Sequence, residues 1–411
     1  MKRFLFIVTG LLIISQFELR AQESLVASAG SVITVESGAG LFITGGIEMQ
    51  KNSTLYNDGS IAISKTSTGA ADFTDHNDKV YSYGTGKFIF AGTGSQNIFS
   101  VNRFGLIEVN NSGLNLMSDI RANNWYLKSG KVTTGNFYAI VSGTDEDAIQ
   151  AGISNSRFSL SWINGNLRRY INPVAFNRYL FPVGDDAKVN MAELDNLSYK
   201  PLTGLQYVDA SFGAKPGNDA GLNIRTANRY CASVSNGGVW RLVTDAVPSG
   251  GNFDLKLFVD GFKGLENKEL GILQRPADSY MASAWTLPAG NSLFAADRLG
   301  RYISENNLSI FGQFGVGIIS MVTPVTSYVK DASLKVYPNP VIDNQFYVEY
   351  NGIKVNAVKL LAADGKTVAC NFKIQKSNQL KVSLPVFMAK GIYTLQLDTD
   401  NGLQSTKINL Q

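Results

Sequence analysis

Short runs of alternating hydrophobic and polar residues dominate the chain between residues 22 and 151. Segments of three to five residues carry apolar side chains two positions apart, as in Ser31–Glu36, Leu41–Ile43 and Trp125–Leu127. A spacing of two places these side chains on one face of a β-strand. Glycine, or asparagine beside glycine, ends most of the segments, and both residues favour tight turns. The pattern predicts a series of very short β-strands.

The shortness of these strands favours a coiled β-solenoid over residues 22–151. In a solenoid each turn stacks on the next and the inward side chains form ladders, whereas the strands of a β-sandwich are usually longer. The stretch Leu55–Ile61 reads Leu-Tyr-Asn-Asp-Gly-Ser-Ile. It resembles the Leu-x-Asn-x-Gly-x-Ile unit of filamentous-haemagglutinin-like β-helices. An irregular β-sandwich is the alternative.

From about residue 152 the predicted strands lengthen, and arginine and aromatic residues become frequent. Asn164-Gly165 lies between apolar runs and predicts a hairpin turn, while Pro182-Val-Gly184 predicts the end of a strand. Phe253–Val259 alternates like a half-buried strand. Other segments resemble motifs of large secreted surface proteins of Bacteroidetes, and the resemblance implies a β-sandwich over residues 152–321. These segments are Ser161–Tyr170, Tyr179–Asp185, Tyr199–Leu202, Gly238–Leu242 and Leu308–Gly315.

A compact module is predicted over residues 334–411, after a linker at 322–333 that contains Thr323-Pro-Val-Thr-Ser. A strand ends there on Tyr-Pro-Asn-Pro, at residues 337–340. Val358–Val368 reads as strand, Asp-Gly turn and strand, and Gly391–Leu397 alternates again. About seven strands over this length are typical of a small Ig-like sandwich.

In order and in position, these motifs resemble the type A C-terminal sorting domain of the type IX (Por) secretion system of Bacteroidetes. The resemblance implies translocation across the outer membrane by the type IX machinery to the cell surface or medium. It further implies cleavage in the linker by a sortase-like peptidase and attachment to anionic lipopolysaccharide. The chain departs from the family in ending Asn-Leu-Gln rather than in a β-branched run. An ordinary Ig-like ligand-binding module is the alternative. The matching residues are Tyr337, Pro338, Asn339, Pro340, Asp364, Gly365, Lys366, Gly391, Tyr393, Leu395 and Lys407.

The first 21 residues are typical of a secretory signal peptide. Lys2 and Arg3 precede the apolar run Phe4–Ile14, which is too short to span a bilayer comfortably. We expect cleavage after Ala21, so that the mature chain begins at Gln22. An N-terminal membrane anchor is the alternative.

The composition narrows the possible chemistry. The net charge of +4 is spread thinly over 411 residues and leaves no basic patch for nucleic acid. Cys231 and Cys370 are the two cysteines, which excludes a disulfide framework. His76 is the single histidine, so a site with several histidines cannot form within one chain. Chemistry that uses carboxylates alone remains open.

The segment Asp72–Asp78 is the first candidate site, because three carboxylates and His76 are oxygen and nitrogen ligands for a cation such as calcium. It lacks the glycine and the distal glutamate of an EF-hand loop, and a solvated loop is the favoured interpretation. Asp145-Glu-Asp147 is interpreted as an exposed turn in the same way.

Aromatic residues of the central region are the second candidate. Trp162, Tyr170, Tyr179 and Trp240 could form a sugar-stacking platform, although aromatic residues on alternating strands more often belong to the core. Arg168 and Arg169 would point to opposite faces of a strand. One of them could be buried in an ion pair with Asp185 or Asp186.

The sequence therefore predicts an all-β exported protein with a solenoid-like region, a central β-sandwich and an Ig-like sorting domain. We expect a non-enzymatic adhesin or structural component of the cell envelope, without catalytic residue, metal or cofactor. Glycans or other surface proteins are candidate partners, and no nucleic acid is expected. A carbohydrate-degrading enzyme that uses acids such as Asp72, Asp75 or Asp145 and a glycan-binding module are the alternatives.

Overall fold

The computed structural model describes residues 19–21, 24–64, 72–152, 158–172, 177–195, 202–225, 229–288, 292–321, 334–350, 354–400 and 402–411. The expected linker and most of the expected signal peptide, with Gln22, lie outside these residues. The chain divides into two compact units, Met1–Met321 and Val322–Gln411. Apart from two 3-10 turns, Glu146–Ala148 (η1) and Ala282–Ala284 (η2), the described elements are β-strands, which confirms the all-β class. No helix in the described part is long and apolar enough to cross a membrane.

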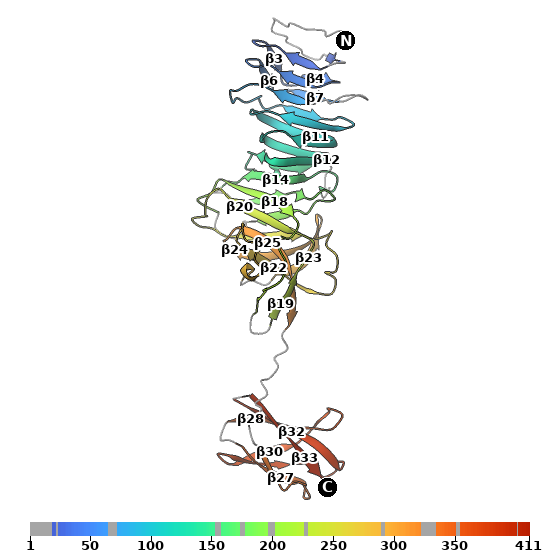
Figure 1. Ribbon diagram of the computed structural model, residues 1–411, viewed down its shortest axis with the longest axis vertical. Helices are drawn as coiled ribbons and strands as arrows, with labels where there is room; N and C mark the ends of the chain where they lie inside the picture. Colours follow the sequence, from blue (N-terminus) through green and yellow to red (C-terminus); the bar gives the residue numbers. More distant parts are fainter. Residues whose placement is uncertain are drawn as a thin grey trace. The chain divides into compact units, whose positions relative to one another are not determined.

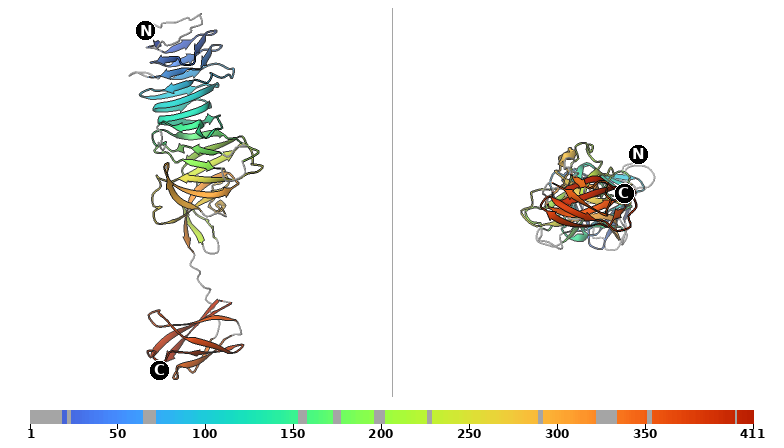
Figure 2. Two further views of the ribbon diagram at one scale, coloured as in Figure 1. Left: turned by 180° about the vertical axis from the view of Figure 1, so that it is seen from behind. Right: turned by 90° about the horizontal axis from the view of Figure 1, so that it is seen from below.

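The N-terminal part of the first unit is a β-solenoid of about seven turns, as predicted (Figure 1). Its strands pair in parallel along each face, so each turn continues the sheet of the turn before. Figure 2 shows the same stacking from behind. One face stacks β4 (Gly40–Ile43), β7 (Ser60–Ile63), β9 (Lys87–Phe90), β11 (Arg103–Leu116), β12 (Ile120–Val141) and β13 (Ile149–Ala151). A second face stacks β2 (Leu25–Ala27), β5 (Ile47–Met49), β8 (Phe73–Asp75), β10 (Ser95–Phe99) and β11. Elsewhere β3 (Val32–Val35) pairs with β6 (Thr54–Asn57), and β1 (Leu19–Ala21) with β4.

Inward ladders explain the period of two in the sequence. Ile61, Phe88, Ile107 and Trp125 occupy equivalent positions on successive turns, and all four are buried. The indole Nε1 of Trp125 donates to the carbonyl oxygen of Ile140 at 3.0 Å. Each apolar side chain therefore packs on its equivalents in the neighbouring turns, and removes water from the solenoid axis.

Two strands are much longer than the pattern predicted. Trp125–Leu127, predicted as a strand of its own, is a small part of β12, and β11 extends over 14 residues. β11 pairs with β9 through its first half and with β10 through its second. Register shifts at Asn110 allow the strand to pass from one face to the next. The chain therefore turns this corner through bulges, without leaving the β conformation.

The sandwich of residues 152–321 continues the solenoid without a break in packing. Strand β14 (Ile163–Tyr170) runs parallel to β12 on one side and antiparallel to β18 (Tyr207–Gly213) on the other. Beyond β18 the sheet continues through β20 (Val239–Thr244) to β25 (Gly312–Met321). Strand β25 also pairs with β22 (Glu269–Arg275) and with β19 (Arg229–Val234), and β16 (Val183–Gly184) pairs with β14. The second sheet has the order β15 (Arg178–Phe181), β17 (Ala192–Asp195), β21 (Phe253–Phe258), β24 (Gly300–Leu308) and β23 (Leu293–Asp297). One hydrophobic cluster contains buried residues of the solenoid and of both sandwich sheets.

One turn prediction and one strand prediction in this region are wrong. Asn164-Gly165 is not a hairpin but lies inside β14, where a Cβ on Gly165 would come within 2.0 Å of the Thr134 hydroxyl. The glycine is needed for this close approach to β12 and for its φ of +126°. Leu308–Gly315 is not one strand, because Leu308 ends β24 and Gly312 begins β25.

The second unit is a small sandwich of two four-stranded sheets. The first has the order β26 (Lys335–Tyr337), β27 (Gln345–Glu349), β31 (Gln379–Ser383) and β30 (Asn371–Lys376). The second has the order β29 (Thr367–Val368), β28 (Val355–Leu361), β32 (Gly391–Thr399) and β33 (Gly402–Leu410). Its separate core includes Phe346, Leu360, Leu380, Leu395 and Leu397.

Candidate functional site

The Tyr-Pro-Asn-Pro motif of the second unit fastens its first strand to its last. The Oδ1 of Asn339 accepts from the backbone N of Asn409 at 2.9 Å, and its Nδ2 donates to the carbonyl oxygen of Lys407 at 3.4 Å. The backbone N of Val341 donates to the carbonyl oxygen of Asn409 at 2.7 Å. The peptide bonds before Pro338 and Pro340 are cis. The motif therefore covers part of the outer edge of β33.

Tyr337 lies at the end of β26 and contacts the neighbouring strand. Its ring stacks on that of Tyr347 with centroids 5.9 Å apart, and its hydroxyl donates to the Oε1 of Glu349 at 2.9 Å. The amide of Gln379 also contacts this hydroxyl. The hydrogen bond to Glu349 raises the pKa of Tyr337, so the phenol remains a donor at neutral pH.

The Asp364-Gly365-Lys366 segment forms the predicted turn between β28 and β29. The backbone N of Lys366 donates to the Oδ1 of Asp364 at 3.1 Å, and Gly365 adopts a φ of +80°, which favours glycine. Hydrogen bonds from Lys366 lower the pKa of Asp364. The lysine and the aspartate are exposed.

The Gly391–Leu397 strand contributes core residues. Tyr393 and Leu395 are buried, and the hydroxyl of Tyr393 donates to the carbonyl oxygen of Ala389 at 2.7 Å. A tyrosine bonded to the backbone a few residues upstream resembles the tyrosine corner of Ig-like sandwiches. Lys407 is exposed on β33. Much of the motif therefore folds the domain, and its lysines remain on the surface.

In the first unit, the structure corrects the interpretation of Asp72–Asp78 as a solvated loop. Asp75 is inside the solenoid with no exposed surface. Its carboxylate accepts from the backbone N and Nδ2 of Asn77 at 2.9 and 2.7 Å, from the Nδ2 of Asn102 at 2.6 Å, and from the hydroxyl of Tyr83. Burial raises the pKa of Tyr83 well above its usual value, so the phenol stays protonated and donates to Asp75.

The other acidic candidates have hydrogen-bond partners that differ from those of Asp75. Asp72 accepts from the backbone N and Nδ2 of Asn97 at 2.8 and 3.0 Å. The Nε2 of His76 is 3.6 Å from the Oε1 of Glu48, and both side chains are about half exposed. Asp145–Asp147 is exposed, as expected. Within the described ranges, no three His, Cys, Asp or Glu side chains are placed to hold a metal ion.

The arginine pair does point to opposite faces of β14, but its partners differ from the prediction. Arg169 is fully buried, and its guanidinium donates to the carbonyl oxygens of Leu180 at 2.7 Å and of Asp145 and Glu146 at 2.8 Å each. Burial lowers its pKa to about 10. The two aspartates predicted as its partners make other contacts. Asp185 accepts from the backbone N of Ala187 and of Lys188, and Asp186 pairs with Lys131. Arg169 thus connects the last solenoid turn to the second sheet of the sandwich.

Arg168 forms the centre of a ladder on the outer face of β12, β14 and β18. It donates from Nε and Nη2 to Asp209 at 2.7 and 2.8 Å, and these bonds raise its pKa. Its guanidinium lies 3.9 Å from the ring centroid of Tyr207 and 4.7 Å from that of Tyr138. The ring of Tyr170 lies next to that of Tyr207, with their centroids 5.4 Å apart. Arg168 and Tyr170 are two positions apart on β14, and so are Tyr207 and Asp209 on β18. This spacing places each pair on one face of its strand and is the sequence signal for this surface.

The four aromatic candidates divide between core and surface. Tyr179 and Trp240 are fully buried, as the core interpretation expected. Trp162 and Tyr170 are half-buried. The Nε1 of Trp162 donates to the carbonyl oxygen of Asp185 at 2.9 Å. The Nε1 of Trp240 donates to the carbonyl oxygen of Asn190 at 2.7 Å. The four therefore do not share one platform.

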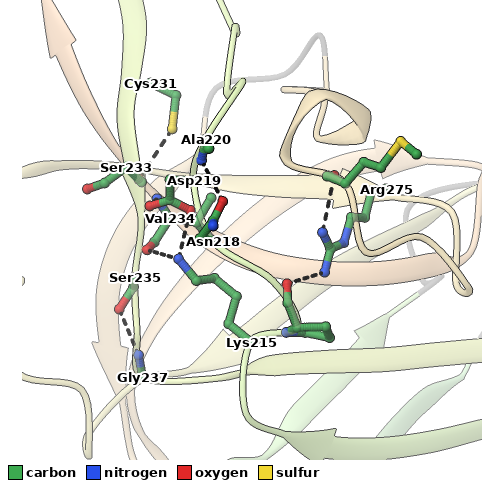
Figure 3. Close-up of polar contacts among 12 residues, drawn as sticks. Lys215, Asn218, Asp219, Ala220, Cys231, Ser233, Val234, Ser235, Gly237 and Arg275 are labelled. Carbon is green, nitrogen blue, oxygen red and sulfur yellow. Dashed lines mark hydrogen bonds and ion pairs between the residues drawn. The ribbon is translucent and has the colours of Figure 1, made fainter.

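The surroundings of Cys231 make its thiol a poor nucleophile (Figure 3). The thiol is 3.4 Å from the carbonyl oxygen of Ser233, and burial raises its pKa to about 11. In the same region the Nζ of Lys215 donates to the Oδ1 of Asp219 at 2.7 Å and to the carbonyl oxygen of Val234 at 3.2 Å. Since Asp219 also accepts from the backbone N of Val234, this ion pair has a structural role.

Comparison with known proteins supports one part of the chain. Residues 335–411 match the family model described as a secretion system C-terminal sorting domain. Comparison with curated proteins gave no match. The matched segment contains the two hydrogen bonds between Asn339 and the backbone of β33, which we call the Asn339 clasp. It also contains the Asp-Gly turn and the Tyr393 strand, and the domain implies a bacterium of the Bacteroidetes. It also implies interaction with the type IX machinery. Residues 335–411 are therefore a type IX secretion C-terminal sorting domain, and the chain is a protein exported across the outer membrane to the cell surface or the extracellular space.

Proposed function

We propose that the exported body, residues 22–321, is a non-enzymatic adhesin or structural component of the cell envelope. The main support is that the solenoid and the sandwich share one sheet through β14 and one hydrophobic cluster. A continuous sheet and core resist bending, because bending at the junction would separate packed side chains. Such a body suits the display of a surface away from the cell.

The contacts of the candidate acids also favour a role without catalysis. Catalytic carboxylates of glycosidases work as a pair across a cleft, and the acid needs a raised pKa. Asp75 is enclosed by donors and has no exposed surface to offer a substrate. Asp145 is exposed and Asp72 bonds to Asn97. These contacts support a structural or solvated role for each of the three carboxylates.

A comparison of binding with turnover tests this proposal. Purified residues 22–321 would be tested for adhesion to host and bacterial surfaces and for release of reducing ends from a polysaccharide panel. We expect adhesion or envelope association without turnover. Turnover that is abolished by Asp72→Asn or Asp145→Asn, with unchanged folding, would contradict the proposal and support a carbohydrate-degrading enzyme.

Glycan binding is a second candidate, and the Arg168 ladder favours it. Tyr138, Tyr170 and Tyr207 are partly exposed on one sheet face, and aromatic faces can stack on sugar rings. Asp209 and Arg168 would supply hydrogen bonds beside them. A glycan array would compare the body with its Tyr207→Ala variant, using Tyr280→Ala as the control because Tyr280 is exposed outside the ladder. Binding that is lost in the first variant only would favour this candidate.

The proposal includes release from the sorting domain and attachment to anionic lipopolysaccharide. Cleavage by a sortase-like peptidase between residues 322 and 333 is supported by the division of the chain into two compact units at Met321. Mass spectrometry of the surface form should find a C-terminus in this segment joined to lipopolysaccharide. A surface form that retains residues 334–411 would contradict this part of the proposal.

A further inference from the structure

The sorting domain exposes large apolar side chains at one end. Ile342, Val386, Phe387 and Ile392 are 68%, 73%, 98% and 62% exposed, the four highest values for large hydrophobic residues in the described part of this domain. We call these four residues the apolar end. Exposure of large apolar side chains to water is unfavourable. A group of them on the surface of a small domain is typical of an interaction site.

Backbone contacts bring the three segments of the apolar end together. Val341, which precedes Ile342, bridges to Leu410, and Leu410 pairs with Gly391 at the start of β32. Ile392 follows directly. The segment that carries Val386 and Phe387 is held at one side by the bond from the backbone N of Leu384 to Asn344, 2.8 Å, and at the other by the Tyr393–Ala389 bond. The three segments that carry these four residues therefore meet near the end of β33 and the start of β32.

The sorting motif supports this surface and borders it through the exposed Asn339 and Pro340. Asn339 is engaged with the backbone of β33, Tyr393 with Ala389, and Leu395 with the core. Pro340 and Asn339 position Val341 in the core, with Ile342 next to it on the surface. Exposed polar and charged side chains border the apolar end, among them Asp343, Lys390 and Lys407.

The edge strand β30 is a less suitable docking surface. All six of its residues are exposed, including Phe372 and Ile374, so it could in principle add a strand from a partner. It carries Lys373 and Lys376, however, and its pairing with β31 has a register shift. Lysines and bulges on edge strands oppose the addition of another strand.

We infer that the apolar end is the surface by which the outer-membrane part of the type IX machinery holds this domain. This partner is the one that the domain family implies, and the inference does not depend on what the body does. Its site should present an apolar pocket that receives Phe387. The Asn339 clasp would then matter for export indirectly, because it keeps Ile342 and the end of β33 in place.

Export of the full chain from a type IX-competent host tests the inference. Phe387→Ser and Ile392→Ser would be compared with Ile374→Ser, a matched change of an exposed apolar residue on β30. We expect the first two to lower the surface and medium fraction at least about tenfold, as loss of an interface anchor does, while Ile374→Ser changes it little. Melting temperatures of the purified full-length variants should match the unmodified chain, since all three side chains are exposed.

A photo-crosslinking residue at position 387 provides a second readout that does not depend on export. We expect a cross-link to an outer-membrane component of the machinery from position 387 and none from position 374. Normal export of both Phe387→Ser and Ile392→Ser would overturn the inference. A cross-link from position 387 to a second copy of this chain alone, or to lipid alone, would overturn it as well.

Discussion

Replacement of Arg169 by methionine tests how the solenoid is joined to the sandwich. The guanidinium contacts three carbonyl oxygens from two segments, the η1 region at Asp145 and Glu146 and the strand β15 at Leu180. Methionine keeps an unbranched apolar stem, which is shorter than arginine, and has no donor. The substitution therefore leaves three buried carbonyl groups without this partner, while it removes a buried charge.

The magnitude follows from these two opposing effects. A hydrogen bond from a charged donor contributes about 1.5–3 kcal/mol, so the three bonds of Arg169 contribute roughly 6 kcal/mol. The lowering of its pKa to about 10 corresponds to about 3 kcal/mol against the buried charge. Arg169→Met should therefore reduce the free energy of unfolding by about 3 kcal/mol.

Urea unfolding of residues 22–321 would measure the loss, with Arg241→Met as the control. Arg241 makes an exposed ion pair with Asp278, and such pairs contribute about 1 kcal/mol or less. Hydrogen exchange should also increase around Asp145–Ala151 in the Arg169 variant alone. An Arg169→Met variant that is no less stable than Arg241→Met would refute the role of Arg169 as the connection between the two parts.

Three further predictions concern single side chains. Asp75→Asn should cost about 2–3 kcal/mol in urea unfolding, because an amide group replaces an acceptor among four donors; unchanged stability would show that the carboxylate is not needed for folding. Cys231 should react with a thiol reagent at pH 8 about a hundredfold more slowly than a free cysteine, because the raised pKa leaves little thiolate; equal rates would contradict its burial. Asn339→Ala should lower the stability of the sorting domain by about 1–2 kcal/mol in calorimetry, and Asn339→Asp by less, because it keeps the acceptor for Asn409. Equal losses in the two Asn339 variants would contradict this assignment.

Local patterns were sufficient for the ladders and for the sorting module. The spacing of two between apolar residues reports directly on one face of a strand, so the pattern predicted short strands with inward ladders. The turn at Asp364-Gly365 and the alternation at Tyr393 are also local, since each depends on neighbours within a few residues. Features of this kind leave their signal in a short window of sequence.

Features that depend on distant partners could not be read in this way. Asp75 looks like a surface carboxylate until Tyr83 and Asn102 surround it, eight and 27 residues away. The partners of Arg169 are backbone carbonyls, which have no sequence signature. Gly165 next to an asparagine indicates a hairpin locally, yet its real requirement is the close approach of Thr134 in a neighbouring strand.

The central claim is that residues 334–411 direct a separately folded body out of the cell. Deletion of this segment and fractionation of a type IX-competent host test it most directly, with limited proteolysis as the control for folding of the truncated chain. We predict a protease-resistant body, because its core is complete without the sorting domain. We also predict that this body remains in the periplasm, because it has lost the signal for export. Display of the truncated protein at the cell surface, or its release into the medium, would contradict the account.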